Sequence, residues 1–324
     1  MTARMLGLCG MAAWALAAGA RQEFTARPFP PEVKTIGVVM PASILAKARF
    51  DKGVAMLEKA GYRVKTAKRL SFAKVAPVAD RVADFEETWL DPEVDLVLCA
   101  RGGTGAQDVI TKVDWEKLKA RPNQRVLGFS NITMILNAML KKGVGHPISG
   151  STISHFLYAQ GDTCDWLNRA VAGAPQPEAK LTPLRPGAFE GLPCGGHIAL
   201  VALGVKMDWT VGASNRVVFL ERNPSTDLKG LKGELDYLAA SGWLKGAAGV
   251  VFGDVRAKQT GGGGTDPKAV PASRADVEAL RREFAQKMTC PVYEGYAYGH
   301  IPVSHAIDFR RVVSVAADGT MRWK

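Results

Sequence analysis

The feature that most constrains this chain is a regular alternation of short strand-like runs and amphipathic segments between residues 34 and 140. The strand-like runs cover 35–40, 62–66, 94–100 and 126–129. Segments with helical periodicity follow them, at 44–60, 79–90, 106–113 and 132–140. Strands that alternate with helices pair in parallel, so we expect an α/β fold with a doubly wound sheet. Functional groups of such sheets collect beyond the carboxyl ends of the strands.

A change of composition after residue 160 predicts a second domain. The stretch 161–192 contains four prolines and little periodicity beyond about residue 172, and we interpret it as a linker. Further on, we expect strands at 216–221 and 247–252, helices near 195–205, 230–241 and 273–287, and a final hairpin that turns at Asp318-Gly319. The sequence therefore predicts a doubly wound N-terminal domain (34–160) and a smaller, β-rich α/β C-terminal domain (193–324).

The overall composition is that of a globular protein. The chain has 324 residues, of which 47% are hydrophobic, and this excludes disorder as its main state. A net charge of +11 favours anionic partners. The basic residues form no clear stripe and no nucleic-acid-binding motif is present, so we expect no nucleic-acid partner.

Residues 1–20 have the pattern of a secretory signal peptide. Arg4 is their only charge, Met5 to Ala20 is an uncharged apolar run, and Ala18-Gly19-Ala20 supplies a small-x-small cleavage site. We therefore expect a periplasmic or secreted protein without stable membrane insertion after cleavage. An uncleaved anchor is the alternative, and a leader that does not function would leave the protein in the cytoplasm.

The cysteines left after cleavage predict no metal site. Cys99 lies in an apolar run and is expected to be a buried thiol, whereas a disulfide between Cys164 and Cys194 is conceivable in an oxidising compartment. No C-x-x-C pair occurs, so a structural zinc site has no support, and we expect no cofactor.

Two segments in the first domain could carry chemistry. Ser130 lies between a buried strand and a helix start, as a nucleophile at a strand-to-helix elbow does, although serine is also a favoured helix N-cap. The glycine loop 101–105 follows another strand, and its exposed N–H groups could bind an oxyanion or a phosphate. A tight turn is the alternative for this loop, because it matches neither a dinucleotide fingerprint nor a phosphate P-loop.

Two segments in the second half are further candidates. Glu221 ends an apolar strand, where catalytic residues often lie, although the pattern by itself favours a salt-bridged strand end. Of the five histidines, His300 is distinctive because it follows Tyr296-Ala-Tyr-Gly299 after a strand. The residues alone do not bring Ser130, Glu221 and His300 together.

An ordered set of motifs resembles the LD-carboxypeptidase family, serine peptidases that include the muramoyltetrapeptide carboxypeptidases and the microcin C immunity peptidases. The resemblance covers about 34–324, nearly the whole mature chain. Its motifs are Met40-Pro-Ala-Ser43, Leu57-Glu-Lys-Ala-Gly-Tyr-Arg-Val64, Ala79-Asp-Arg-Val-Ala-Asp-Phe85, Asp91-Pro-Glu-Val-Asp-Leu-Val-Leu-Cys-Ala-Arg-Gly-Gly103, Val113-Asp-Trp115, Gly128-Phe-Ser-Asn-Ile-Thr133, Gly195-Gly196, Phe219-Leu-Glu221 and Gly299-His300.

The resemblance implies a fold, a reaction and a set of roles. It implies a catalytic triad of Ser130, Glu221 and His300 between the two domains, without a metal or cofactor. It also implies an oxyanion hole at the amides of Gly103 and Asn131. Residues of the glycine loop, Arg101 and Thr104, are the expected substrate-binding residues. The family substrate is a peptidoglycan stem tetrapeptide, cut between an L-centre and the terminal D-alanine, and family members often form homodimers.

The chain departs from the family pattern around the expected site. Thr104 replaces a usual tyrosine, Asn131 a usual aspartate and His197 a usual asparagine, and Ser149-Gly-Ser151 stands where His-Gly-Pro is typical. These changes leave the triad positions in place but alter the lining. Two alternatives to a stem-peptide carboxypeptidase therefore stay open: a related peptidase or amidase acting on another conjugate, such as a peptidyl-nucleotide antibiotic, and a non-catalytic periplasmic binding protein.

Overall fold

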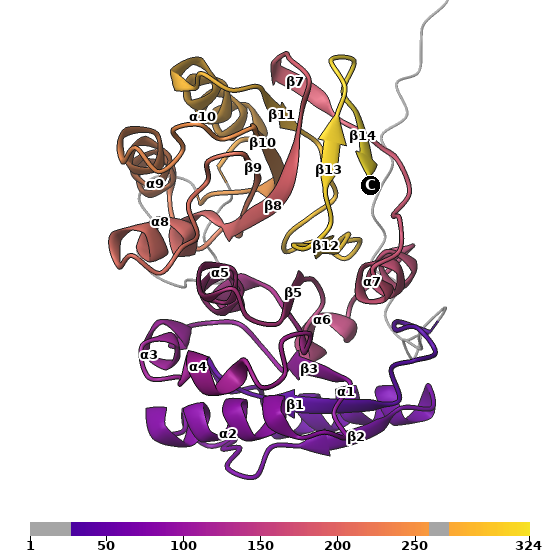
Figure 1. The fold of residues 1–324 in the computed structure, drawn as a ribbon. Coiled ribbons are helices and arrows are strands. Elements are labelled where there is room, and N and C mark those ends of the chain that lie inside the picture. Colours follow the sequence, from indigo (N-terminus) through magenta and orange to yellow (C-terminus); the bar gives the residue numbers. More distant parts are fainter. Residues whose placement is uncertain (1–26, 259–271) are drawn as a thin grey trace, which may run out of the picture.

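A computed structural model describes residues 27–258 and 272–324, which form two sheets stacked one above the other (Figure 1). The first sheet has the order β12-β5-β4-β3-β1-β2, and its strands β1 to β5 are parallel. Its strands are β1 (Thr35–Val39), β2 (Arg63–Thr66), β3 (Leu96–Cys99), β4 (Arg125–Gly128), β5 (His146–Ser149) and β12 (Ile307–Asp308). All residues of β1 and β3 are buried, as expected for strands with helices on both faces. The predicted doubly wound sheet is thereby confirmed.

Helices cover both faces of this sheet. They are α1 (Lys47–Lys59), α2 (Val78–Leu90), α3 (Ala106–Ile110), α4 (Trp115–Leu118), the 3-10 helix η1 (Ser130–Ile132), α5 (Thr133–Lys142) and α6 (Ile153–Phe156). Helix α5 ends at Gly143, whose φ of +66° suits a left-handed cap that only glycine adopts readily. It lies between the two sheets and also packs on α8 and β8 of the second half (Figure 1).

The second sheet is mixed, with the order β6-β14-β13-β8-β9-β10-β11-β7. Its central strands β8, β9, β10 and β11 are parallel, and its outer strands pair antiparallel. The strands are β6 (Ala179–Lys180), β7 (Thr182–Arg185), β8 (Phe189–His197), β9 (Arg216–Arg222), β10 (Gly249–Val255), β11 (Val292–Glu294), β13 (Val313–Val315) and β14 (Thr320–Trp323), and the helices are α8 (Ile198–Lys206), α9 (Leu228–Ala240) and α10 (Arg274–Lys287). The predicted β-rich second half and its final hairpin, β13–β14, are both present.

The segment 161–192 contains more regular structure than its prolines suggest. It includes α7 (Thr163–Ala172), the edge strands β6 and β7 and the start of β8. The prolines lie after α7 or at the edges of the sheet, where a missing N–H costs no ladder bond. A second connection joins the halves near the end of the chain, because β12 returns to the first sheet and pairs with β5.

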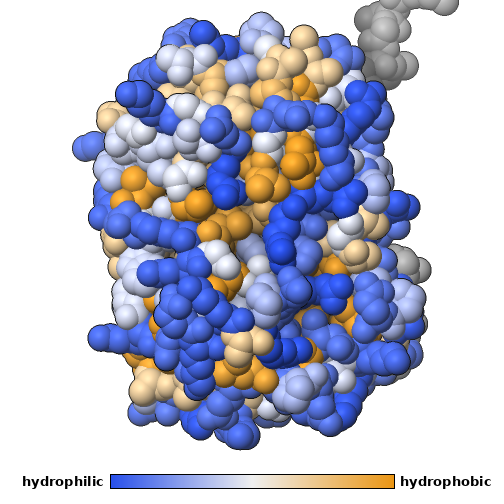
Figure 2. All heavy atoms as spheres, viewed as in Figure 1, coloured by the Kyte–Doolittle hydropathy of each residue, from blue (hydrophilic) through white to orange (hydrophobic). Residues whose placement is uncertain are grey.

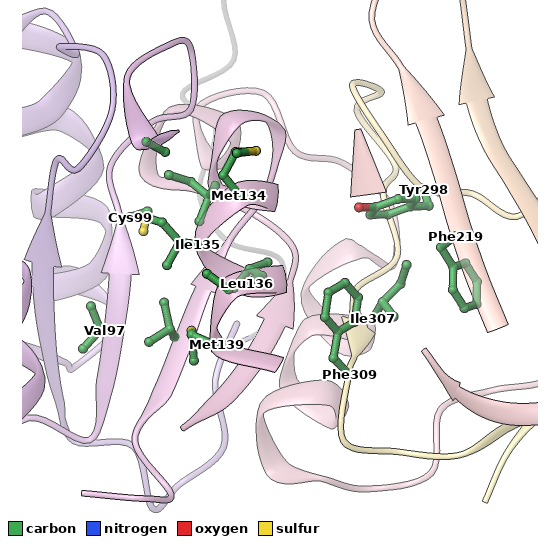
Figure 3. Close-up of a cluster of buried hydrophobic side chains, with 14 of the residues drawn as sticks. Val97, Cys99, Met134, Ile135, Leu136, Met139, Phe219, Tyr298, Ile307 and Phe309 are labelled. Atoms are coloured by element: carbon green, nitrogen blue, oxygen red, sulfur yellow. The ribbon is translucent and has the colours of Figure 1, made fainter. Parts of the chain in front are cut away.

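The hydrophobic core is continuous across the two halves. One buried cluster includes Val97 and Ile135 of the first half together with Phe219, Tyr298 and Phe309 of the second half (Figure 3). The cysteines of the described residues, Cys99, Cys164, Cys194 and Cys290, are all buried free thiols. Cys99 is therefore buried as predicted, and the conceivable disulfide between Cys164 and Cys194 is absent.

The outer surface is largely polar on the face that Figure 2 displays, with hydrophobic atoms in scattered groups among charged side chains. No helix within 27–258 or 272–324 is both long and apolar enough to span a bilayer. The predicted leader, residues 1–20, lies outside the described residues.

Candidate active site

The candidate residues of the first half lie at one edge of its sheet. The strand order β2-β1-β3-β4-β5 has a switch point between β1 and β3, where ligands of open α/β sheets usually bind. The segment after β1 and the glycine loop after β3 meet there, since Ser43 N donates a hydrogen bond to Gly102 O at 3.2 Å. Ser130 follows β4, the next strand along, so all three segments reach the same carboxyl edge.

Ser130 has a backbone conformation unusual for a serine. Its φ is +62°, in the left-handed region, and it is the first residue of η1, directly after Phe129. A nucleophile elbow holds its serine in this kind of strained strand-to-helix turn. The side chain is half-buried, and its hydroxyl forms no hydrogen bond within the described part of the chain. The Ser130 hydroxyl therefore does not cap the helix that follows it.

Gly102 packs directly against Ser130. A Cβ at position 102 would lie 2.8 Å from Ser130 Oγ and 2.9 Å from the amide nitrogen of Asn131. Only a glycine leaves room for this contact. The next residue, Gly103, has a φ of +101° and faces Ser43, whose Oγ would lie 2.3 Å from a Cβ there.

Residues around these glycines are held by the segment after β1 and by Asn131. The Ser43 hydroxyl accepts a hydrogen bond from Thr104 N at 2.9 Å, and Arg101 donates from Nη1 to Ile44 O at 2.8 Å. The buried side chain of Asn131 accepts from Ala106 N at 2.8 Å. The hydrogen bonds of the described loop use the N–H groups of 104, 105 and 106 and leave that of Gly103 without an acceptor.

Glu221 and His300 of the second half form a hydrogen-bonded ionisable pair. His300 Nδ1 lies 2.8 Å from Oε2 of Glu221, a fully buried carboxylate near the end of β9. Burial acts to raise the pKa of Glu221, but the charges of His300 and His197 and the hydrogen bond from His300 together hold it below its usual value. A carboxylate only accepts hydrogen bonds, so Nδ1 carries the proton and Nε2 of a neutral His300 has a free lone pair.

The two halves of the site meet through aromatic contacts. The ring of Phe129, next to Ser130, lies with its centroid 4.8 Å from that of His300. His197 lies 5.8 Å from His300 by the same measure, and is paired in register with Glu221 across β8 and β9. The structure therefore brings together Glu221 and His300, and places the residue before Ser130 against the imidazole. Catalytic hydrogen bonds are often long or absent without substrate.

The remaining histidines are fixed in other ways. His146 begins β5 and so lies at the end of the strand opposite to the glycine loop. Its Nε2 is 2.6 Å from Asp308 Oδ1. His305 stacks on Trp166, with ring centroids 3.8 Å apart, and pairs with Asp162. His155 is buried between Phe129 and Tyr158. Within 27–258 and 272–324, no group of three His, Cys, Asp or Glu side chains could hold a metal ion.

Several residues around His300 were missed by the sequence reasoning. Arg256 donates from Nη2 to His300 O at 2.6 Å and from Nε to Asp254 Oδ2 at 2.8 Å. His155 contacts Ile301 O through Nε2 at 2.9 Å. Asp254 lies near the carboxyl end of β10, so the strand-end argument that selected Glu221 could have found it. The roles of Arg256 and His155 left no signal in the local pattern.

Comparison with protein families identifies both halves. Residues 36–149 match the model of the LD-carboxypeptidase N-terminal domain, and residues 190–315 match that of the LD-carboxypeptidase C-terminal domain. Together, the two matches span more than half of the chain.

Individual proteins give the same result. A Bacillus subtilis protein named "Probable murein peptide carboxypeptidase" is 25% identical over 296 residues, which are 84% of this chain and 86% of the relative. The microcin C7 self-immunity protein of Escherichia coli is 25% identical over 105 residues, 32% of this chain and 30% of the relative. The crystal structure of muramoyltetrapeptide carboxypeptidase from Oxalobacter formigenes matches with a TM-score of 0.74 at 20% identity, covering 90% of this chain and 98% of that one. The last likeness is one of fold.

Proposed function

Because the chain belongs to the LD-carboxypeptidase family, and so to the hydrolases, we propose that it is a serine carboxypeptidase acting on peptidoglycan-derived tetrapeptides. It would remove the terminal D-alanine from the L-centre that precedes it. The observation that carries the proposal is the buried Glu221–His300 pair beside a serine in a left-handed turn. The Bacillus subtilis relative named for murein peptide carboxypeptidase activity supports the substrate class.

The first half of the reaction would form an acyl-enzyme. Ser130 Oγ attacks the peptide carbonyl carbon while His300 Nε2 takes its proton. Glu221, bonded to Nδ1 at 2.8 Å, holds the imidazole in the required tautomer and stabilises the imidazolium. The amide N–H groups of Gly103 and Asn131 receive the oxyanion, at about 3–4 kcal/mol per donor in other enzymes. When the C–N bond breaks, His300 returns the proton to the amine of the leaving D-alanine.

The second half would release the shortened peptide. Water gives a proton to His300 and attacks the ester carbon, and collapse of this second tetrahedral species returns the proton to Ser130 Oγ. No metal takes part in these steps. A carboxypeptidase must also bind a free carboxylate, and Arg101 at the exposed glycine loop is our candidate, with Thr104 beside it. The chain's net charge of +11 suits a stem peptide that carries several carboxylates.

The test is mass spectrometry of muropeptides after incubation with the protein. We expect tetrapeptides to lose one alanine, with activity abolished in Ser130→Ala and His300→Ala. His146→Ala is the matched histidine control: it removes the contact with Asp308 and some stability, but lies at the start of β5, away from Ser130, and should leave turnover largely intact. Turnover that persists in Ser130→Ala would overturn the serine mechanism.

A second candidate function is hydrolysis of another peptide conjugate. It is favoured by the altered lining, in particular the buried His197 beside Glu221, and by the match to the microcin C7 self-immunity protein. Incubation with a peptidyl-nucleotide in parallel with tetrapeptide separates the two. If the protein binds either compound but neither hydrolyses it nor reacts with a serine-directed probe, it is a binding protein.

We also propose that the protein acts outside the cytoplasm after loss of residues 1–20, with the site shared between an N-terminal domain (34–160) and a C-terminal domain (193–324). Intact-mass analysis of protein from the cell envelope should then give a chain beginning at Arg21. A cytoplasmic product that begins at Met1 would contradict the location but not the reaction.

A further inference from the structure

The segment that carries His300 has little regular structure of its own. It runs from the end of β11 at Glu294 to the start of β12 at Ile307, and no helix or strand lies between them. His300 must nevertheless be held between Glu221 of the second half and Phe129 of the first half. We call residues 295–306 the His300 loop. Hydrogen bonds within the loop, such as that from Gly299 N to Ser304 Oγ at 3.1 Å, order part of it, and contacts that other elements supply fix its place in the site.

The second half holds the His300 loop through Arg256. This side chain donates from Nη2 to the carbonyl oxygen of His300 at 2.6 Å, and from Nε to Asp254 Oδ2 at 2.8 Å. The Asp254 backbone is also engaged, because its N–H donates to Tyr298 O at 2.8 Å. A guanidinium fixed by a carboxylate on one edge has little freedom left, so its other edge holds the carbonyl in a defined place.

The first half holds the same loop through His155. Its Nε2 lies 2.9 Å from the carbonyl oxygen of Ile301, the residue after His300, and its Nδ1 lies 2.7 Å from Ser151 Oγ. A carbonyl can only accept, so Nε2 carries the proton and Ser151 donates to Nδ1. Burial lowers the pKa of His155 to about 4, which keeps the ring in this neutral form near pH 7. The ring also packs edge-on against Phe129 at 5.4 Å between centroids.

We propose that Arg256 and His155 are positioning residues, which hold the carbonyl groups of His300 and Ile301 from opposite sides of the site. The inference rests on the proposed function, in which His300 is the general base. Neither residue touches the reacting atoms. Each acts through the backbone on the distance from His300 to Glu221 and to Ser130.

The expected effect follows from the geometry that catalysis needs. A displacement of about 1 Å in a catalytic group can lower the rate about 100-fold. The hydrogen bond from His300 to the Glu221 carboxylate favours the protonated imidazole, and a looser loop weakens this bond. Among the described residues, the ionisable groups that face His300 are Glu221, His197, His155, Asp254 and Arg256, and of these only Glu221 forms a hydrogen bond with its ring. Loss of the His155 contact, which removes no charge at neutral pH, should therefore move the acid limb of the kcat profile to lower pH. Loss of Arg256 also removes a cation that disfavours the imidazolium, so this variant is assessed by kcat and KM.

The experiment compares variants that remove the side-chain N–H donor of Arg256 or His155 with variants that retain a donor at the same position. Arg256→Met and His155→Leu should lower kcat about 10- to 100-fold and change KM by less than about threefold, and His155→Leu should also move the acid limb to lower pH. Arg256→Lys and His155→Gln, which retain a donor, should recover part of the lost kcat. Arg121→Met is the matched control, because Arg121 also donates to backbone carbonyls, at Trp89 O (2.8 Å) and Val94 O (3.0 Å), but away from the site. It should lower thermal stability and leave kcat and the pH profile unchanged.

A second measurement does not depend on turnover. Amide hydrogen exchange of the His300 loop should accelerate in Arg256→Met and in His155→Leu, and stay at the wild-type rate in Arg121→Met. Unchanged exchange in folded Arg256→Met and His155→Leu would overturn the positioning roles, as would a fall in kcat that the donor-retaining variants do not rescue. If the wild-type protein cleaves no peptide while the exchange result holds, the proposed function fails and the loop contacts stand.

Discussion

Replacing Glu221 by glutamine tests the central pair of the site. The substitution keeps the shape of the side chain and removes its charge. Glu221 is fully buried, and its Oε2 lies 2.8 Å from His300 Nδ1, so water cannot take over its role. The glutamine amide can also donate to Nδ1, which would place the histidine proton on Nε2 and remove the general base.

The size of the effect can be worked from this geometry. With charge centres about 4 Å apart and an effective dielectric constant of about 20, the carboxylate stabilises the imidazolium by about 4 kcal/mol. Loss of that interaction in the transition state lowers kcat about 1000-fold. In another serine triad, the corresponding acid-to-amide substitution, which also gives the wrong tautomer, lowers kcat about 10,000-fold in total.

The assay measures D-alanine release between about pH 4 and 9. In Glu221→Gln, the acid limb of the kcat profile should move to lower pH, because the imidazolium has lost the carboxylate that favoured it. Asp308→Asn is the matched control: it removes another buried carboxylate from a histidine, at 2.6 Å from His146, but away from Ser130. This control should lose stability and keep its kcat profile.

Two results would refute the reasoning. One is a folded Glu221→Gln protein whose kcat stays within about tenfold of wild type and whose acid limb does not move. The other is an equal loss of kcat in Asp308→Asn, which would mean that any buried histidine–carboxylate pair supports the fold on which activity depends.

Three more predictions use other parts of the structure. Gly102→Ala should lower kcat about 100-fold, because its Cβ would lie 2.8 Å from Ser130 Oγ, whereas Gly212→Ala, where a Cβ meets nothing within 4 Å, should not; equal activities would contradict the packing. The free energy of unfolding should fall by about 3 kcal/mol between pH 6.5 and pH 4 through His155 alone, since burial lowers its pKa to about 4 and the unfolded chain takes up the proton first; urea unfolding of His155→Gln should show a shallower pH slope. In a Cys9→Ser chain, the four free thiols of the described residues should react rapidly with iodoacetamide only after denaturation. Burial raises the pKa of Cys194 to about 12 and that of Cys164 to about 11, so little thiolate is present in the native protein, and rapid labelling before denaturation would contradict this.

The sequence by itself determined the local structure that positions most candidate residues. Buried strands and amphipathic helices differ in period, so the alternation in the first half predicted its parallel sheet. Ser130 could be placed between a strand and a helix for the same reason, and the glycine loop beyond the preceding strand. These features depend on neighbouring residues, which is why a single sequence is enough to find them.

Other segments were not readable from local pattern. The four-residue strand β5 and the short strand β12 carry too few residues for a period, and α7 lies inside a stretch that its prolines marked as a linker. Strand pairing between β12 and β5 joins residues far apart in the chain, so no local signal encodes it.

Only the tertiary structure decided how the site is assembled. Glu221 and His300 are 79 residues apart, and their hydrogen bond exists because β9 and the His300 loop pack together. Arg256 and His155 reach that loop from different halves of the chain. A hydrogen bond between side chain and backbone depends on distance and direction in three dimensions, and sequence spacing carries neither across such separations.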